Sequence, residues 1–331
     1  MRETIKKLAS VYGPVGREGR IADAIREMVV PYVDEVKQDA LGNLICIRKG
    51  EGKRVMLAAH MDQIGLIVTD IDQNGCLNVH NVGAVRVLGM LNRHVVFANG
   101  TQGVVTYREE GFKPENAKVS DLFIDIGARN REEALKKISV GDVAVYTPDV
   151  FDLGVDCVCG TALDDRACCA MLVETLKALK TRNNEIYAVF TVQEEVGQRG
   201  VEAAAYEVNP ELGIVLDVTH SWDVSKGSCG NPVLGKGPCV KVLDGAIICT
   251  PKVVEMIENA AERAEIDTQR EVLTRGRTDG GMIQRARAGV PTGGVSLALR
   301  YVHSSCEVIS VSDAEKGAEL LVEILDNPIE I

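Results

Sequence analysis

Five segments of this 331-residue chain place a histidine or a carboxylate at the end of a predicted strand or the start of a predicted helix. Two of them read "VMLAAHMDQIG" and "SLALRYVHSSCE", and the others read "GTALDDRACC", "YAVFTVQEEVGQRG" and "LGIVLDVTH". The polar residues in these positions are His60, Asp62, Asp164, Asp165, Glu194, Glu195, Asp217 and His303. Two histidines and three or more carboxylates are the ligand set of a hydrolytic centre with two zinc ions, because carboxylates bridge cations and neutral imidazoles fill terminal positions.

Each of these residues also has an ordinary explanation when it is taken alone. An aspartate at a strand end caps a helix, a pair of glutamates forms a solvated face, and a lone histidine belongs to the core or the surface. The metal interpretation therefore depends on all five segments meeting in space. His80, His94 and His220 lack the same setting, and we predict structural or surface roles for them.

The elements that must bring these residues together alternate between strands and helices. Apolar periodicity predicts helices over 2–12 and 18–30, then strands over 43–48 and 54–60. After residue 156 it predicts the further elements that follow: helices over 165–179, 200–208, 251–264, 279–286 and 312–325, and strands over 185–192, 212–216, 268–273 and 292–297. Such alternation predicts an α/β fold with a mixed, mostly parallel sheet and helices on both faces, and ligands gather at the ends of such strands.

A different sequence pattern interrupts this alternation of strands and helices. Short β-rich runs such as "HVVFANGTQGVVTY" and "DLFIDIGA" are separated by Gly, Asn and Asp turn residues. We therefore expect a small β-barrel-like domain over residues 69–155, inserted into an α/β domain that comprises residues 1–68 and 156–331.

Composition excludes several classes of protein. The chain has 46% hydrophobic and 26% charged residues, which is typical of a globular protein. Its formal charge of −11, without a run of Lys and Arg, argues against nucleic acid as a partner. No apolar run approaches the roughly 18 residues of a membrane span, and the charged start differs from a signal peptide, so we expect a cytoplasmic protein and no membrane partner. The ten cysteines include no CxxC pair, and we expect them to be reduced.

The chain resembles the tetrahedral (TET) metallo-aminopeptidases, which include glutamyl and deblocking aminopeptidases and proteins often labelled cellulase M. The blocks that carry the resemblance span nearly the whole chain in the family's order: "AAHMDQIG", "ALDDR", "TVQEEVGQRG", "LDVT", "LGKGP", "TDGG" and "GVPTGGVSLALRYVHSSCE". Agreement over so many blocks is far more specific than one short motif. The resemblance implies a cytoplasmic enzyme that hydrolyses N-terminal residues from peptides with free N-termini and holds two divalent metal ions per subunit, zinc or cobalt.

The resemblance also implies a ligand set for these ions. Asp164 is expected to bridge both of them. His60 and Asp217 are expected to bind one ion, and Glu195 and His303 the other.

Two further residues receive catalytic roles from the same resemblance. Glu194 is expected to act as the general base, which takes a proton from a metal-bridging water, leaves hydroxide as the nucleophile and then protonates the leaving amine. Asp62 is expected to orient His60 by accepting its imidazole N–H, without binding metal itself. The resemblance further implies a cis peptide bond between Asp164 and Asp165.

The family's assembly gives the insert an expected role. In that family the inserted β domain pairs subunits into dimers, and six dimers form a hollow tetrahedral dodecamer. We therefore expect residues 69–155 to be a dimerisation domain and the chain to form a homo-oligomer.

Some positions depart from the family pattern. Gln63 stands where Glu is common, Gln198 replaces an apolar residue, and Cys168 stands where Gly is common, close to the expected bridging aspartate. None of these changes removes an expected ligand, but a side chain at position 168 would crowd the helix start and alter metal affinity.

Other functions remain open at this level. A related dimetal amidase, a deacylase or a carboxypeptidase, would share the ligand set. A glycoside hydrolase (an endoglucanase), which the cellulase label suggests, needs two carboxylates and has no use for the histidines. A non-catalytic scaffold fits worst, because the base and every ligand position are filled. The sequence leaves the preferred N-terminal residue undetermined, with Arg277, Asp279 and Arg300 as candidates for lining its pocket.

Overall fold

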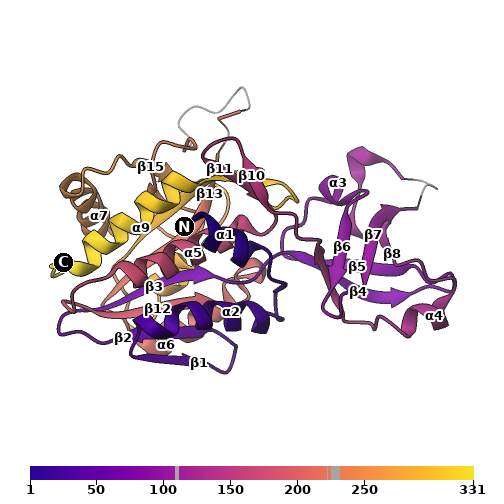
Figure 1. Ribbon diagram of the computed structural model, residues 1–331, viewed down its shortest axis with the longest axis horizontal. Coiled ribbons are helices and arrows are strands. Elements are labelled where there is room, and N and C mark those ends of the chain that lie inside the picture. Colours follow the sequence, from indigo (N-terminus) through magenta and orange to yellow (C-terminus); the bar gives the residue numbers. More distant parts are fainter. Residues whose placement is uncertain (109–111, 222, 225–231) are drawn as a thin grey trace.

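In the described part of the chain, the strands form one large sheet and one small closed barrel (Figure 1). A computed structural model describes residues 1–108, 112–221, 223–224 and 232–331. Helices cover the large sheet, and the barrel lies to one side of it as a separate body. The predicted α/β class with a barrel-like insert is confirmed.

The centre of the large sheet is parallel. Its four central strands, in spatial order, are β12 (Glu185–Thr191), β3 (Arg54–His60), β13 (Leu212–His220) and β16 (Thr292–Arg300). Nearly every residue of these strands is buried and most are apolar, as a parallel sheet covered on both faces requires.

Antiparallel strands extend this centre on both sides. Beyond β12 lie β2 (Leu44–Arg48) and β1 (Glu35–Gln38). Beyond β16 lie β17 (Glu307–Ser310), β11 (Cys157–Gly160) and β10 (Phe151–Leu153), and a branch of β14 (Cys239–Leu243) and β15 (Gln269–Val272) also pairs with β16.

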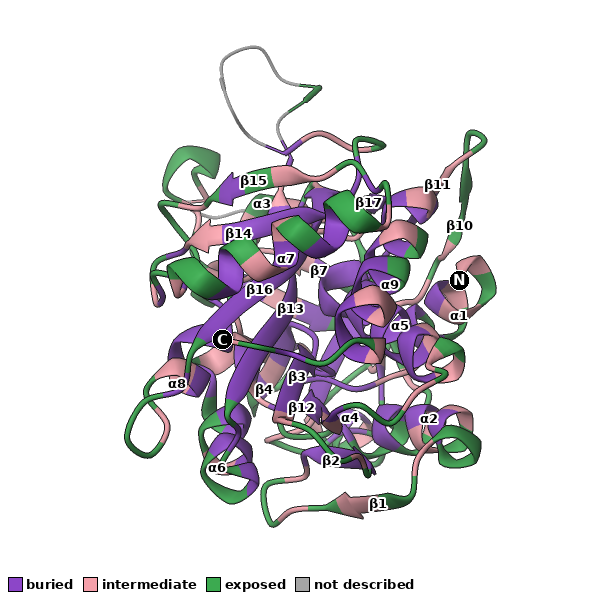
Figure 2. Cartoon of the chain, turned by 90° about the vertical axis from the view of Figure 1, so that its left-hand side faces the viewer, coloured by how far each residue is buried: buried purple, intermediate pink, exposed green. Residues whose placement is uncertain are grey.

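Helices pack on both faces of the large sheet. One face is covered by α1 (Arg2–Ala9), α2 (Gly19–Val29), α5 (Leu163–Ala178), α7 (Pro251–Arg263) and α9 (Val311–Asp326). The other face is covered by α6 (Arg199–Val208) and α8 (Gly280–Gln284). Figure 2 shows the buried central strands between these helices. Short 3-10 helices, η1 (Val30–Tyr32) and η4 (Glu194–Val196), complete the α/β part.

The barrel closes from six antiparallel strands. In order around the barrel they are β4 (Gly65–Ile71), β5 (Leu77–Val82), β8 (Leu122–Asp125), β7 (Gln102–Tyr107), β6 (His94–Phe97) and β9 (Val143–Tyr146). Its connections hold α3 (Val87–Met90), η2 (Pro114–Asn116), η3 (Val119–Asp121) and α4 (Arg131–Leu135). The barrel has its own apolar core, separate from the two cores of the sheet. Closure leaves its strands without free edges.

The predicted elements agree with the structure except at strand ends and in short strands. The strand predicted over 212–216 continues to His220, and the strand predicted over 292–297 continues to Arg300, because β13 and β16 pair along this whole length. Five short strands of the large sheet were not predicted: β1, β10, β11, β14 and β17. In the described ranges, none of the helices is both long enough and apolar enough to span a bilayer.

Candidate metal centre

The parallel strands deliver the predicted site residues to one edge of the sheet. β3 ends at His60, and the turn after β12 carries Glu194 and Glu195 in η4. β13 carries Asp217, and the turn after β16 carries His303. Because the carboxyl ends of parallel strands meet at one edge, residues more than 240 positions apart in the sequence come together.

Two of the placements differ in detail from the sequence prediction. Asp217 lies inside β13, which continues to His220, and so does not follow a strand end. α5 begins at Leu163, and Asp164 and Asp165 occupy its irregular first turn. The peptide bond between these two aspartates is cis, as expected from the resemblance.

Asp164 lies between the two histidines. Its Oδ1 is 3.1 Å from His60 Nε2, and its Oδ2 is 3.3 Å from His303 Nε2. His303 Nε2 is also 3.1 Å from Glu195 Oε1. One carboxylate thus faces a different imidazole with each of its oxygens, which is the arrangement that a bridging ligand needs.

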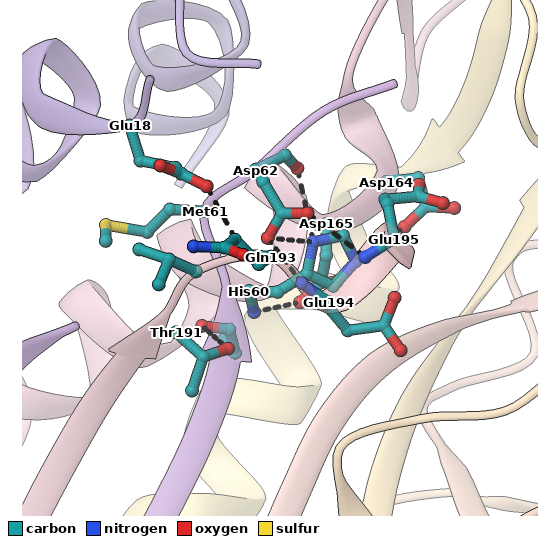
Figure 3. A network of polar contacts seen from close by, with 12 residues as sticks. Glu18, His60, Met61, Asp62, Asp164, Asp165, Thr191, Gln193, Glu194 and Glu195 are labelled. Carbon is teal, nitrogen blue, oxygen red and sulfur yellow. Dashed lines mark hydrogen bonds and ion pairs between the residues drawn. The ribbon is translucent and has the colours of Figure 1, made fainter. Parts of the chain in front are cut away.

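Asp62 holds the turn that carries the two glutamates. Its Oδ1 accepts the main-chain N–H of Glu194 at 2.9 Å, and its Oδ2 accepts that of Glu195 at 3.1 Å (Figure 3). His60 Nδ1 lies 3.2 Å from the main-chain oxygen of Asp62 and 3.7 Å from its carboxylate. The main-chain carbonyl is therefore the nearer acceptor for the imidazole, and the carboxylate fixes the glutamate turn.

Left-handed backbone conformations gather in the loops of the site. Of the nine non-glycine residues with positive φ in the described part of the chain, five belong to these loops: Ala162, Gln193, Gln198, Tyr301 and His303. L-residues seldom adopt such φ values, and the cost persists only where the surroundings fix the conformation. The turns that present the site residues are therefore held by their contacts.

The carboxyl groups of the site are difficult to ionise in the protein alone. Burial raises the pKa values of Asp165, Glu194 and Asp217 well above the ordinary range, and it also raises the pKa of Glu195. For Asp164, burial acts in the same direction, but hydrogen bonds from His303 and His60 outweigh it and lower its pKa. The acids compete for the few positive groups within reach.

The two imidazoles are easier to protonate than usual, because their acidic neighbours outweigh the effect of burial. Burial acts to lower the pKa of His303, but Asp164 and Glu195 outweigh it and raise that pKa to about 11. His60 is likewise buried, and contacts with Asp164 and Asp62 raise its pKa well above the usual value. In both rings, the contacts with carboxylates therefore favour the protonated form of the imidazole.

The donor set fits divalent cations. Two groups of side chains bring ligand atoms within 4.8 Å of one another: His60 with Asp165 and Asp217, and His60 with Asp164 and Glu195. Asp165 Oδ1 is buried and lacks a hydrogen-bond partner among the described residues. Imidazole nitrogen and carboxylate oxygen are the ligands of zinc and similar ions. The first group contains Asp165, where the resemblance implied that Asp164 binds.

Two supporting contacts were not foreseen from the sequence. Glu307 is buried, and its oxygens accept the main-chain N–H groups of His303 at 2.7 Å and Asp164 at 3.2 Å. His303 Nδ1 lies 2.9 Å from the main-chain oxygen of Ala84, which follows β5 of the barrel. Glu307 closes the quoted block "VHSSCE", but only the folded arrangement shows what it contacts.

Two of the departures from the family pattern touch the site. Gln198 Nε2 donates to Glu194 Oε1 at 2.9 Å, so an amide fixes the carboxylate expected to be the base. Cys168 is fully buried and hydrogen bonded to Asp165, and the neighbouring Cys169 donates to the main-chain oxygen of His60 at 3.1 Å. The expected crowding at position 168 is thus accommodated within the core.

A cavity of about 660 Å³ opens on this centre. The loop 273–278 forms part of its wall and places Arg275 and Arg277 there, and both arginines are exposed without an ion-pair partner in the described residues. Hydrogen bonds from Gly245 N to Gly276 O at 2.9 Å and from Thr278 Oγ1 to Asp244 at 2.6 Å hold the loop. The cavity therefore combines an acidic floor with a basic wall.

The remaining predictions about the pocket have mixed outcomes. Arg277 lines the cavity as proposed, and His220, predicted to be structural or on the surface, lines it too. Arg300 does not line it, because its guanidinium binds Asp223 through two contacts of 2.7 Å. Asp279 lies buried behind the site and accepts the hydroxyl of Thr191 at 2.6 Å.

Comparison with known proteins identifies relatives over the whole chain. Residues 42–320 match the model of the M42 glutamyl aminopeptidase family. A putative aminopeptidase of Acetivibrio thermocellus is 44% identical over 98% of both chains, and a lysyl aminopeptidase of Pyrococcus furiosus is 33% identical over 98% of this chain and 96% of its own.

Solved structures give the same result. An aminopeptidase of the archaeon Desulfurococcus kamchatkensis superposes with a TM-score of 0.95 at 34% identity, covering 98% of this chain and 94% of that one. The Pyrococcus horikoshii TET1 peptidase, which assembles into a tetrahedron or a large octahedral shell, superposes with a TM-score of 0.86 at 30% identity over 98% of both chains.

Proposed function

The chain belongs to the M42 glutamyl aminopeptidase family and is a peptide hydrolase, and from that premise we propose that it releases N-terminal residues from peptides at a centre of two divalent cations, zinc or cobalt. The observation that carries the proposal is Asp164, whose two oxygens face His60 and His303 separately. The proposed ligands are His60, Asp164, Glu195, Asp217 and His303. Asp165 is a further candidate ligand, because its carboxylate groups with His60 and Asp217.

The bound cations and the side chain of Glu194 have different roles in the proposed reaction. Bound divalent cations lower the pKa of water and polarise a carbonyl group, which provides a nucleophile and an electrophile at neutral pH. Glu194 is buried, its pKa is raised by that burial, and Gln198 and Asp62 fix its carboxylate and its main chain. It is therefore placed to take a proton at a carboxylate oxygen and to pass it to the leaving amine.

The proposed cations also account for a preference for free N-termini. The floor of the cavity carries several carboxylates, among them Glu194, Glu195 and Asp217. A cation held by Glu195 or Asp217 would also bind a free α-amino group and so orient the peptide, and a blocked N-terminus offers no such ligand. This favours an aminopeptidase over a related amidase that acts on blocked substrates.

The basic wall of the cavity favours acidic N-terminal residues. Arg275 and Arg277 are free to bind a carboxylate, and a guanidinium group does so with two parallel hydrogen bonds. One relative is named for lysine, so the preference must be tested directly on this chain.

Aminoacyl chromophores with glutamate, lysine and leucine test the proposal, using protein loaded with zinc or cobalt. We expect metal-dependent release of the chromophore, fastest for glutamate, which stops after complete chelation or after Glu194→Gln. Hydrolysis of blocked substrates alone would indicate a related amidase. Cellulose hydrolysis that persists after chelation would indicate a glycoside hydrolase.

We also propose that the barrel mediates self-association. The family resemblance implies that residues 69–155 are a dimerisation domain, and the similar structures include a peptidase that assembles into a tetrahedron or a large octahedral shell. A light-scattering mass near twelve subunits would support a dodecamer, and a mass near one subunit would refute self-association.

A further inference from the structure

The structure assigns the N-terminal segment, residues 8–18, to the support of the proposed metal centre, with Glu18 as a positioning residue for the turn that carries Glu194 and Glu195. This inference rests on the proposed function, because it concerns the same centre. It adds a part of the chain that provides no ligand and lies outside every block quoted for the family resemblance.

Glu18 is buried where its surroundings are exposed. Its side chain is 6% exposed, while the neighbouring Arg17 and Gly19 are exposed. Its Oε1 accepts the main-chain N–H of Gly16 at 2.7 Å. It also accepts the main-chain N–H of Gln193 at 3.2 Å (Figure 3). Burial of a carboxylate is unfavourable unless hydrogen bonds compensate it, so these two bonds explain why the side chain turns inward.

Gln193, which Glu18 contacts, directly precedes the turn that carries Glu194 and Glu195. Gln193 has φ +57°, a left-handed conformation that an L-residue keeps only when neighbouring groups fix it. Glu18 accepts its N–H, and Asp62 accepts the next two N–H groups, those of Glu194 and Glu195. Two carboxylates thus bind three successive main-chain donors and determine where the two glutamate side chains begin.

The same segment is bonded to the turn that follows His60. Gln63 N donates to Gly13 O at 3.2 Å, and Val15 N donates to Gln63 O at 3.3 Å, so the two stretches pair as an isolated bridge. The segment therefore joins the His60 turn to the Glu194 turn from outside the sheet.

Arg166 completes this connection from α5, the helix whose first turn carries Asp164. Its guanidinium is fully buried and donates from Nε to Met61 O at 2.6 Å, and from its other nitrogens to the main-chain oxygens of Leu8, Val11 and Gly13 at 2.9–3.2 Å. A planar group with several fixed donors links four main-chain acceptors rigidly. The N-terminal segment is thereby tied to all three loops that carry His60, Asp164 and Glu194.

Substitution of Glu18 separates positioning from simple stabilisation. In Glu18→Ala both hydrogen bonds are lost, and in Glu18→Asp the charge stays but the shorter side chain no longer reaches Gln193. In Glu18→Gln the amide oxygen still accepts both N–H groups. Glu27→Ala on α2 is the matched control, since Glu27 is exposed and has no side-chain partner in the described residues.

Metal retention and steady-state kinetics are the two readouts, measured on the full-length protein loaded with zinc and titrated with a chelator. We expect Glu18→Ala and Glu18→Asp to bind metal about tenfold more weakly, the lower end of the range for groups that orient ligands. At saturating metal we expect kcat to fall more than KM changes, with Glu18→Gln close to the unsubstituted protein and Glu27→Ala equal to it.

A lower Tm with unchanged metal affinity and unchanged kcat in both Glu18→Ala and Glu18→Asp would overturn the inference. If Glu18→Ala fails to fold, Glu18→Asp decides the question alone. The two proposals fail differently, because metal retention is read without any substrate. An unsubstituted protein that binds metal but leaves every free-amine peptide intact would refute the aminopeptidase and still allow the positioning role to be measured.

Discussion

Two clusters of buried acids lie in neighbouring parts of the large sheet, and they balance their charge differently. In the first, Lys241 of β14 forms an ion pair with Glu271 and lies 3.8 Å from Asp244, with all three side chains at most 1% exposed. Asp244 also accepts N–H groups of Ala246 and Ile247. This cluster contains its own cation.

The second cluster is the candidate metal centre. Within the described residues, the ion-pair partners of Asp164 and Glu195 are histidines only, and Asp217 has none. Its acids outnumber its cationic groups, and burial raises most of their pKa values. Buried charge is tolerated when it is paired or when it binds a metal ion. A lysine side chain therefore balances the acids of the structural cluster. The candidate metal centre has too few positive groups for its acids, and so it needs external cations.

The largest expected effect separates chemistry from binding within the metal centre. Glu194→Gln keeps the size of the side chain but removes the proton acceptor, so we expect kcat to fall about a thousandfold, within the range of general-base catalysis. Metal content and Tm should stay unchanged. Steady-state hydrolysis of a glutamyl chromophore measures this, with Glu202→Gln, an exposed position on α6, as the control. Full activity of Glu194→Gln would remove this residue from the mechanism.

The next prediction removes the cation from the other cluster. Lys241→Met leaves Glu271 and Asp244 buried without their partner, so we expect the free energy of unfolding to fall by roughly 3–5 kcal/mol. Urea unfolding measures the loss, with Lys252→Met on the exposed face of α7 as the control. The folded variant should retain its metal. Loss of metal at unchanged stability would show that the two clusters are not distinct in role.

A pH series on metal-free protein tests the charge balance of the second cluster. Burial raises the pKa of Asp279 to about 7 and that of Glu307 to about 8. A raised pKa means that the folded state binds the proton more tightly than the unfolded chain, so this stabilisation is complete below about pH 4 and is lost as the pH rises through 7 to 8.

We therefore expect the Tm of chelated protein to be lower at pH 8 than at pH 5.5, by about 2–4 °C for each kcal/mol lost. Metal-loaded protein is the control and should change less, because bound cations replace the protons. A Tm of the chelated protein that rises over this interval would contradict the charge balance described above.

The smallest expected effect concerns the loop that rests on the structural cluster. Arg277→Ala removes one of the two cationic groups of the wall, so we expect kcat/KM to fall about fivefold for glutamyl substrates and to stay unchanged for leucyl ones, as the loss of about 1 kcal/mol requires. Arg199→Ala, at an exposed position outside the cavity wall, is the matched control. Equal losses on both substrates would assign Arg277 a general role.

Much of the fold and the core of the site could be predicted because periodicity and strand order carry them. The buried runs before His60, Glu194 and His303 identify parallel strands, and the ends of such strands share an edge. Asp217 was placed at a strand end because the apolar run stops there, but pairing with β16 extends β13 to His220. The sequence pattern shows where the apolar residues stop. Hydrogen bonding to the neighbouring strand determines where the strand ends.

The supporting contacts could not be predicted for a physical reason. Glu18, Glu307 and the main-chain oxygen of Ala84 each act on a segment that the sequence pattern does not connect with them. Glu18 meets Gln193 across 175 positions, and the Lys241 cluster forms where β15 pairs with β14, a short strand without clear periodicity. Such contacts follow from tertiary packing and not from spacing along the chain.

A metal titration tests the central claim most directly. Chelator-stripped protein is reloaded with zinc and its bound metal is counted per chain, alongside Asp217→Asn and Lys241→Met. We expect two ions per chain in the unsubstituted protein and in Lys241→Met, and fewer in Asp217→Asn. Protein that binds no ion, or that hydrolyses free-amine peptides equally well after complete stripping, would contradict it.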